Sequence, residues 1–156
     1  MPRVPPPVYA VGAALAQRVL VRGRPTVTRG RSALTAVVAL ASAAMAGAAD
    51  REFRRRGTTF MPFHPEEASA LVTTGSNAIS RNPMYVGLAG LLAAHAIWRR
   101  SWLALAPLAA FVAVVDRVQI EAEEAALHQK FGTEYDAYRA STPRWLGTRS
   151  FGIGPG

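Results

Sequence analysis

Hydrophobic residues along the chain gather in four runs, 8–21, 32–49, 84–98 and 101–115, which polar stretches separate. The run 32–49 has no charged residue and corresponds to about 27 Å of α-helix, close to the ~30 Å hydrocarbon core of a bilayer. It is rich in Ala, Ser and Gly, which allow helices to pack closely. We predict a membrane span here; the alternative is a buried helix of a soluble bundle.

The runs 84–98 and 101–115 are each about 22 Å long as helices, which is short for independent spans. They predict a helical hairpin with its tip at Arg99–Arg100. Trp98 and Trp102 flank this tip, as aromatic residues do at a membrane interface.

The polar stretch 116–140 predicts an amphipathic helix, because Ile120, Leu127 and Phe131 recur at helical spacing. Gly132 is expected to break or bend it. The predicted fold class is therefore all-α: a polytopic membrane protein with about four transmembrane helices, including the C-terminal hairpin, followed by a cytoplasmic amphipathic C-terminal helix.

Residues 1–31 form an N-terminal unit with a proline-rich start, a short apolar helix and a basic loop. The apolar run 8–21 contains Gln17 and Arg18 and lacks a small-residue cleavage site, so we expect it to be retained. It either spans the membrane or lies in the interface. Residues 32–156 form the predicted core.

Basic residues exceed acidic ones, 18 against 10, for a net charge of +8. Such an excess predicts an anionic partner. The arginines flank the apolar runs and form no stripe with aromatic residues, which favours a membrane surface over nucleic acid. The arginines of 50–57 mark a cytoplasmic flank. We therefore predict a bacterial-type inner or plasma membrane protein whose polar face is cytoplasmic.

Several chemistries are excluded or unsupported. The chain has no cysteine, which excludes disulfides, thiol catalysis and Cys zinc sites. His64, His95 and His128 lack a convincing third ligand, so no metal site is predicted. No glycine-rich loop follows a strand, and no Ser–His–Asp arrangement is evident. No catalytic residue is assigned.

A hairpin brings its two ends together, and polar side chains lie at both ends of this one. The juxtaposed residues are Arg81, Asn82 and Tyr85 on one side and Arg117, Glu121, Glu123 and Glu124 on the other. Polar groups beside an apolar bundle are typical of a small-molecule site. Because consecutive helical residues point about 100° apart, at most one of Glu123 and Glu124 should face the hairpin.

Plainer interpretations exist for the same residues. Asn82 and Pro83 are common at a helix start, and Tyr85 suits a membrane interface. The acidic run could face solvent or form salt bridges with Arg81 or Arg117.

Four motifs occur in order around the hairpin: GTTFMP, LVTTG, RNPMYVG and EAEEAALHQKFGTEYDAYRASTPRWL. Together they resemble the isoprenylcysteine carboxyl methyltransferase family and the related phospholipid methyltransferases, over roughly residues 52–146. Those proteins are integral membrane enzymes that use S-adenosylmethionine. The resemblance implies the same cofactor here, in a site formed by 58–87 and 116–146.

The resemblance also implies which residues contact the cofactor, with Glu123 at its polar end. These are Ser69, Ala70, Leu71, Val72, Asn77, Asn82, Pro83, Met84, Tyr85, Gly87, Glu123, Glu124, Tyr135, Tyr138 and Arg139. Arg81, Arg117 and Gln119 are candidates for positioning. Two positions depart from the family pattern: Asn82 replaces a frequent His, and Gln119 replaces the substrate-binding Arg of the eukaryotic enzymes.

The predicted function is methyl transfer from S-adenosylmethionine to a lipophilic or small thiol or carboxyl acceptor. The alternatives are a phospholipid N-methyltransferase and a non-catalytic membrane protein with an interfacial belt of Arg and Glu. The bilayer is the expected partner. The Ala/Gly-rich span 32–49 could also pack against a second copy of the chain.

Overall fold

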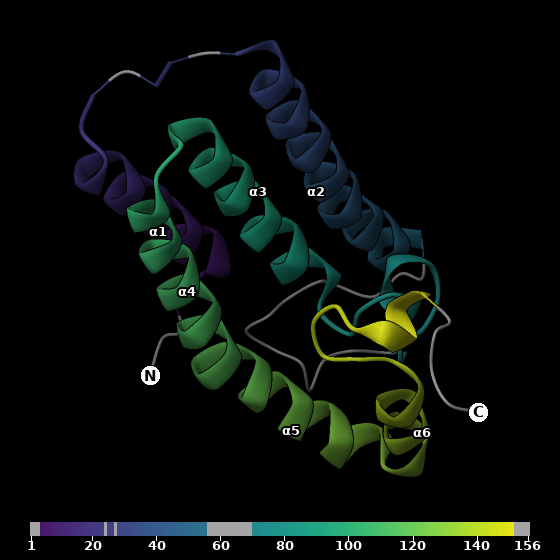
Figure 1. Ribbon diagram of the computed structural model, residues 1–156. Helices are drawn as coiled ribbons and strands as arrows, with labels where there is room; N and C mark the ends of the chain where they lie inside the picture. The colour runs from purple at the N-terminus through teal and green to yellow at the C-terminus, as the bar shows by residue number, and fades with distance from the viewer. Residues whose placement is uncertain (1–3, 24, 27, 56–69, 152–156) are drawn as a thin grey trace.

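The computed structural model is all-helical in the residues it describes, which are 4–23, 25–26, 28–55 and 70–151. The predictions for residues 56–69, including Ser69, lie outside the described residues. Figure 1 shows the helices, which are α1 (Pro6–Leu20), α2 (Arg29–Arg55), α3 (Pro83–Arg99), α4 (Leu105–Val114), α5 (Glu121–Phe131) and α6 (Thr133–Ser141). Short 3-10 turns lie at Gly75–Ala78, Trp102–Ala104 and Thr148–Phe151.

The predicted hairpin is confirmed. Helix α3 begins with Pro83 in its first turn and ends before Arg100, which adopts the left-handed conformation (φ 50°) that reverses the chain. The returning segment runs without a break from Trp102 to Phe131. Its middle, Val115–Ile120, is a π-helix between α4 and α5. This widened turn lies where the apolar run gives way to polar residues, and π-segments are frequent at functional sites.

Helices α2 and α3 pack closely because small residues face each other. A Cβ atom added to Gly87 would lie 2.7 Å from the Ser42 carbonyl oxygen and 2.8 Å from the Ala46 Cβ atom. One at Gly90 would collide with the Ser42 side chain. Small residues at helix contacts let backbones approach, which is how helices associate in lipid.

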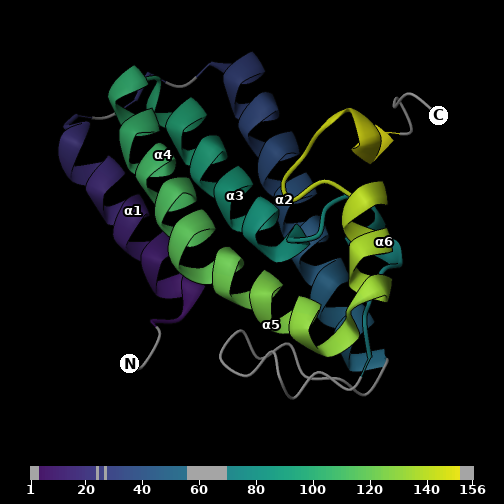
Figure 2. The same cartoon turned by 90° about the horizontal axis from the view of Figure 1, so that it is seen from below.

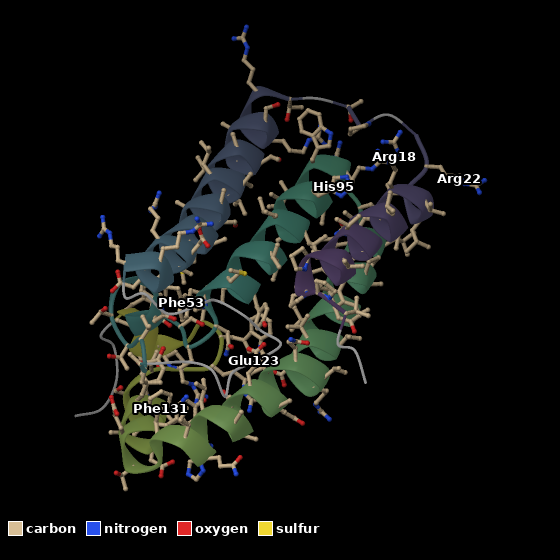
Figure 3. The ribbon with its side chains drawn as sticks, turned by 180° about the vertical axis from the view of Figure 1, so that it is seen from behind. Arg18, Arg22, Phe53, His95, Glu123 and Phe131 are labelled. Atoms are coloured by element: carbon tan, nitrogen blue, oxygen red, sulfur yellow. The ribbon has the colours of Figure 1, made fainter. Side chains whose placement is uncertain are left out.

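Helix α1 is fastened to the hairpin by Gln17, which is fully buried. Its amide nitrogen donates hydrogen bonds to the carbonyl oxygens of Leu92 (3.1 Å) and Ala104 (2.8 Å). Its amide oxygen lies 2.7 Å from Nδ1 of His95, which Figure 3 shows at the end of the bundle away from Glu123. Gln17 therefore does not merely interrupt an apolar helix; it joins three helical segments.

Within the described part of the chain, two helices are long and apolar enough to cross a membrane, Arg29–Arg55 and Trp102–Phe131. Only 6% of the apolar window of α2 is buried within the protein, and Leu34, Val37 and Leu40 are exposed on it. A core helix of a soluble bundle would bury these side chains, so the pattern favours contact with lipid. Helices α1 (15 residues) and α3 (17 residues) are shorter, and the count of four spans stays a prediction.

The polar elements gather at the end of the bundle opposite the hairpin tip (Figure 1). Gly132, at φ 50°, ends α5 and starts α6, which confirms the predicted break. After α6, residues 142–151 turn back toward the N-terminal end of α3, as Figure 2 shows. We call this segment the C-terminal strap. The Arg81 backbone N–H donates to the Pro143 carbonyl at 2.9 Å.

The glycine contact predicts opposite effects for one substitution at two sites. Gly87→Ala should destabilise the protein by about 1–3 kcal/mol, because the new methyl group meets the α2 backbone. Gly47→Ala, on α2, has nothing within 4 Å and should stabilise by up to ~1 kcal/mol through helix propensity. Unfolding in mixed detergent micelles measures both. Equal effects of the two substitutions would contradict the packing described here.

Candidate functional site

A cavity of about 90 Å³ lies where the N-terminal end of α3, which we call its foot, meets α5 and α6. Residues from distant parts of the chain line it: Phe53, Asn77, Arg81, Asn82, Pro83, Met84, Tyr85, Glu123, Glu124, Leu127, Tyr135 and Tyr138. The hairpin brings the two ends together, and α6 adds the two tyrosines. Figure 3 shows Glu123 within the polar end of the bundle, with Phe53 nearby.

Glu123 is held by both halves of the hairpin. The hydroxyl of Tyr85, which is 2% exposed, donates a hydrogen bond to the Glu123 carboxylate at 2.7 Å. The Gln119 amide donates to the same oxygen at 3.1 Å from one turn earlier. Two donors on one oxygen fix the direction of the carboxylate.

Glu124 lies between two guanidinium groups. Arg144 of the C-terminal strap binds it through Nη2 at 2.6 Å and Nε at 3.2 Å, and Nη2 of Arg81 lies 3.2 Å away. Both glutamates therefore line the cavity, but among the contacts described here only Glu123 meets a side chain on helix α3. Two neighbouring faces of α5 are covered, one by Tyr85 and the other by Arg81 and Arg144.

Asn82 has a different role from that of a helix cap. It occupies the N-cap position of α3 but makes no capping hydrogen bond with its side chain. Its amide instead donates to the Arg144 carbonyl at 3.0 Å, and the Ser80 hydroxyl donates to the same carbonyl at 2.9 Å. Here Asn82 acts as a hydrogen-bond donor that holds the strap, which needs no proton exchange.

Tyr135 and Tyr138 form the wall supplied by α6. Their rings meet edge to face with centroids 6.2 Å apart, and Leu71 belongs to the same buried cluster. The Tyr138 hydroxyl donates to the Asn77 carbonyl at 2.6 Å. Burial, with the nearby charge of Glu124, raises the pKa of Tyr135 to about 12, and burial raises the pKa of Tyr138. Near neutral pH both stay protonated, so neither is a base.

Hydrogen-bond donors in the cavity wall lack partners. The Arg81 side chain is 10% exposed, and its Nε and Nη1 atoms are buried without an acceptor among the described residues. The same holds for Nδ2 of Asn77, a residue that is 2% exposed. Buried donors without partners are costly. A ligand that carries a carboxylate or another acceptor group would satisfy them.

Some of the predicted site residues lie away from the cavity. Arg117 and Glu121 are exposed and lie 3.9 Å apart, and Arg139, 48% exposed, lies 3.9 Å from Asp136. Gly87 contacts α2 rather than the cavity. Among the residues before the 3-10 turn, Leu71 and Val72 are buried and Ala70 is half-buried. None of the three lines the cavity.

Residues 142–146 belong to the predicted site, but sequence reasoning did not single out Arg144 or its partner Asp116. The Arg144 guanidinium also contacts Asp116 at 3.1 Å, and the Trp145 indole N–H donates to Asp116 at 2.8 Å. Hydrogen bonds to Glu124 and the charges of Glu124 and Asp116 raise the pKa of Arg144. The available signal was chemical: Asp116 lies at the end of an apolar run, where a carboxylate needs a cationic partner.

Comparison with known proteins adds a family. The family model described as phospholipid methyltransferase matches residues 31–134, more than half of the chain. An uncharacterised protein of Haemophilus influenzae is 38% identical over 63 residues, which are 40% of this chain and the whole of that protein. No solved structure matches the chain.

The pKa of Tyr135 predicts alkaline instability. Unfolded tyrosine titrates near pH 10, whereas the folded value is about 12. The stabilisation is therefore complete below about pH 10 and is lost as the pH rises through about 12. Unfolding midpoints of the wild type should fall over this range, and Tyr135→Phe should flatten the fall. An identical pH profile in the variant would contradict the assignment.

Proposed function

The chain belongs to the phospholipid methyltransferase family, and on that premise we propose that it transfers a methyl group from S-adenosylmethionine to a lipophilic acceptor. The observation that carries the proposal is the pairing, in one cavity, of buried donors without partners and a fixed carboxylate. The donors are on Arg81 and Asn77, and the carboxylate is that of Glu123.

This arrangement fits the amino-acid end of S-adenosylmethionine. That end carries an ammonium group and a carboxylate. Glu123 would accept hydrogen bonds from the ammonium, and Arg81 and Asn77 would donate to the carboxylate. A cavity of about 90 Å³ can hold only this end of the cofactor. Sites that enclose a whole small molecule typically have volumes of about 300–1,000 Å³. The remainder of the cofactor would lie outside this cavity.

Methyl transfer from S-adenosylmethionine mainly requires that protein side chains place the acceptor next to the methyl group. When bound, S-adenosylmethionine supplies an electrophilic methyl group. Residues of the site would orient the acceptor and exclude water, which are the main protein contributions to such a displacement. A thiolate or carboxylate acceptor needs no base. This accords with two protonated tyrosines and with Asn82 serving as a donor to the strap.

A groove beside the site supports a lipophilic acceptor. It has a volume of about 630 Å³ and an almost wholly apolar wall between α2, α3 and α4, including Ala41, Ala89 and Ala93. Trp145 and Leu146 of the strap also line it. Trp145 is bonded to Asp116, and its neighbour Arg144 is bonded to Glu124, which lines the cavity. The strap therefore connects the groove to the cavity.

The acceptor group itself is a thiol, a carboxyl group or the headgroup amine of a phospholipid. Gln119, which replaces the substrate-binding Arg of the eukaryotic prenylcysteine enzymes, is buried and bonded to Glu123. It leaves no cation at that position for a prenylcysteine carboxylate. This favours phospholipid N-methylation as the second candidate function.

Binding of tritiated S-adenosylmethionine to purified protein in detergent tests the cofactor. We expect saturable binding that weakens at least tenfold in Glu123→Ala, the size of a lost charge-assisted hydrogen bond, and that also weakens in Tyr85→Phe. Glu121→Ala is the matched control, since Glu121 is on the same helix with its side chain 53% exposed. The proposal fails if there is no saturable binding, or if Glu123→Ala binds as well as Glu121→Ala.

Filling the groove tests the acceptor. Membranes supplied with labelled S-adenosylmethionine should show label in an extracted lipid or lipophilic product. Ala93→Phe should lower this incorporation several-fold while leaving cofactor binding intact. Ala36→Phe, on the exposed side of α2 outside the groove, is the control. Label found only in water-soluble products, or equal incorporation by both variants, would contradict a lipophilic acceptor.

A further inference from the structure

Arg144 contacts more of the site than any neighbour in the C-terminal strap. Its carbonyl accepts hydrogen bonds from Ser80 and Asn82, which precede α3. Its guanidinium binds Glu124 on α5 and Asp116 in the π-helix. One residue therefore connects the foot of α3 to two parts of the returning helix.

The guanidinium of Arg144 shares Glu124 with Arg81, and the sharing is unequal. Arg144 makes two hydrogen bonds to the carboxylate, at 2.6 and 3.2 Å. Arg81 reaches it through Nη2 alone, at 3.2 Å. The other two guanidinium nitrogens of Arg81 are the donors without partners described above. Without Arg144, Arg81 would be the partner left to balance the negative charge of the Glu124 carboxylate.

We propose that Arg144 is a positioning residue that neutralises Glu124 and so leaves Arg81 free to bind the carboxylate of the cofactor. This inference rests on the proposed function, because it assigns Arg81 to that ligand. Asp116 holds the far side of the Arg144 guanidinium at 3.1 Å. Planar guanidinium can bridge two carboxylates in this way, whereas an ammonium is a point charge that serves one at a time.

A purely structural role of Arg144 would have a different consequence for the double substitution of Arg144 and Glu124. If Arg144 only fastened residues 142–151, removing its charge would loosen the strap and weaken cofactor binding. Removing the charge of Glu124 as well would then not restore binding. If Arg144 acts by neutralising Glu124, neutralising Glu124 directly replaces it. The two roles therefore differ in the sign of the second substitution's effect.

The test measures the dissociation constant of tritiated S-adenosylmethionine for four full-length proteins in detergent, together with their unfolding midpoints. Arg144→Ala should weaken binding about tenfold, the size of a charge-assisted interaction. Adding Glu124→Gln to Arg144→Ala should restore most of that loss. Arg144→Lys keeps the charge beside Glu124, so its dissociation constant should lie between those of the wild type and Arg144→Ala.

Three outcomes overturn the inference. Arg144→Ala could bind as the wild type does, or the double variant could bind no better than Arg144→Ala, or Arg144→Lys could bind as weakly as Arg144→Ala. Should Arg144→Ala fail to fold, comparing Arg144→Lys with Arg144→Lys/Glu124→Gln decides the matter in the same way. Absence of saturable binding by the wild type would overturn the proposed function itself, and this assignment with it.

Discussion

The ion pair between Arg144 and Glu124 fastens the C-terminal strap to the returning helix. An apolar bundle explains why α2, α3 and α4 associate, but it does not fix a polar segment at their end. Charged groups at a membrane boundary are costly unless they are paired. Glu124 and Asp116 lie on the returning helix, and Arg144 satisfies both at 2.6 and 3.1 Å. That pairing holds the strap against Glu124, which lines the cavity.

Sequence reasoning succeeded where the structure depends on neighbours along the chain. The hairpin, its tip beside Arg100 and the break at Gly132 are local features with local signals. The approach of Tyr85 to Glu123 followed from the hairpin alone, since an antiparallel pair brings its ends together. Helical periodicity and turn residues carry that kind of information.

The remainder depends on contacts between distant residues, for which the sequence has no periodic signal. Gln17 resembles an interruption until its carbonyl partners on α3 and before α4 are known. Gly87 was assigned to a cofactor contact, but it lies against Ser42. The strap is irregular, and three of the hydrogen bonds that hold it to the start of α3 end on backbone carbonyls, which any residue provides. These features became visible only when the helices were placed together.

The central claim is that the cavity between Arg81 and Glu123 holds the amino-acid end of S-adenosylmethionine. An experimental structure of the protein in lipid with S-adenosylhomocysteine tests it most directly. The account predicts the ligand carboxylate at Arg81 and Asn77, with the ammonium at Glu123. A ligand bound elsewhere, or one whose amino-acid end points away from these residues, would contradict it.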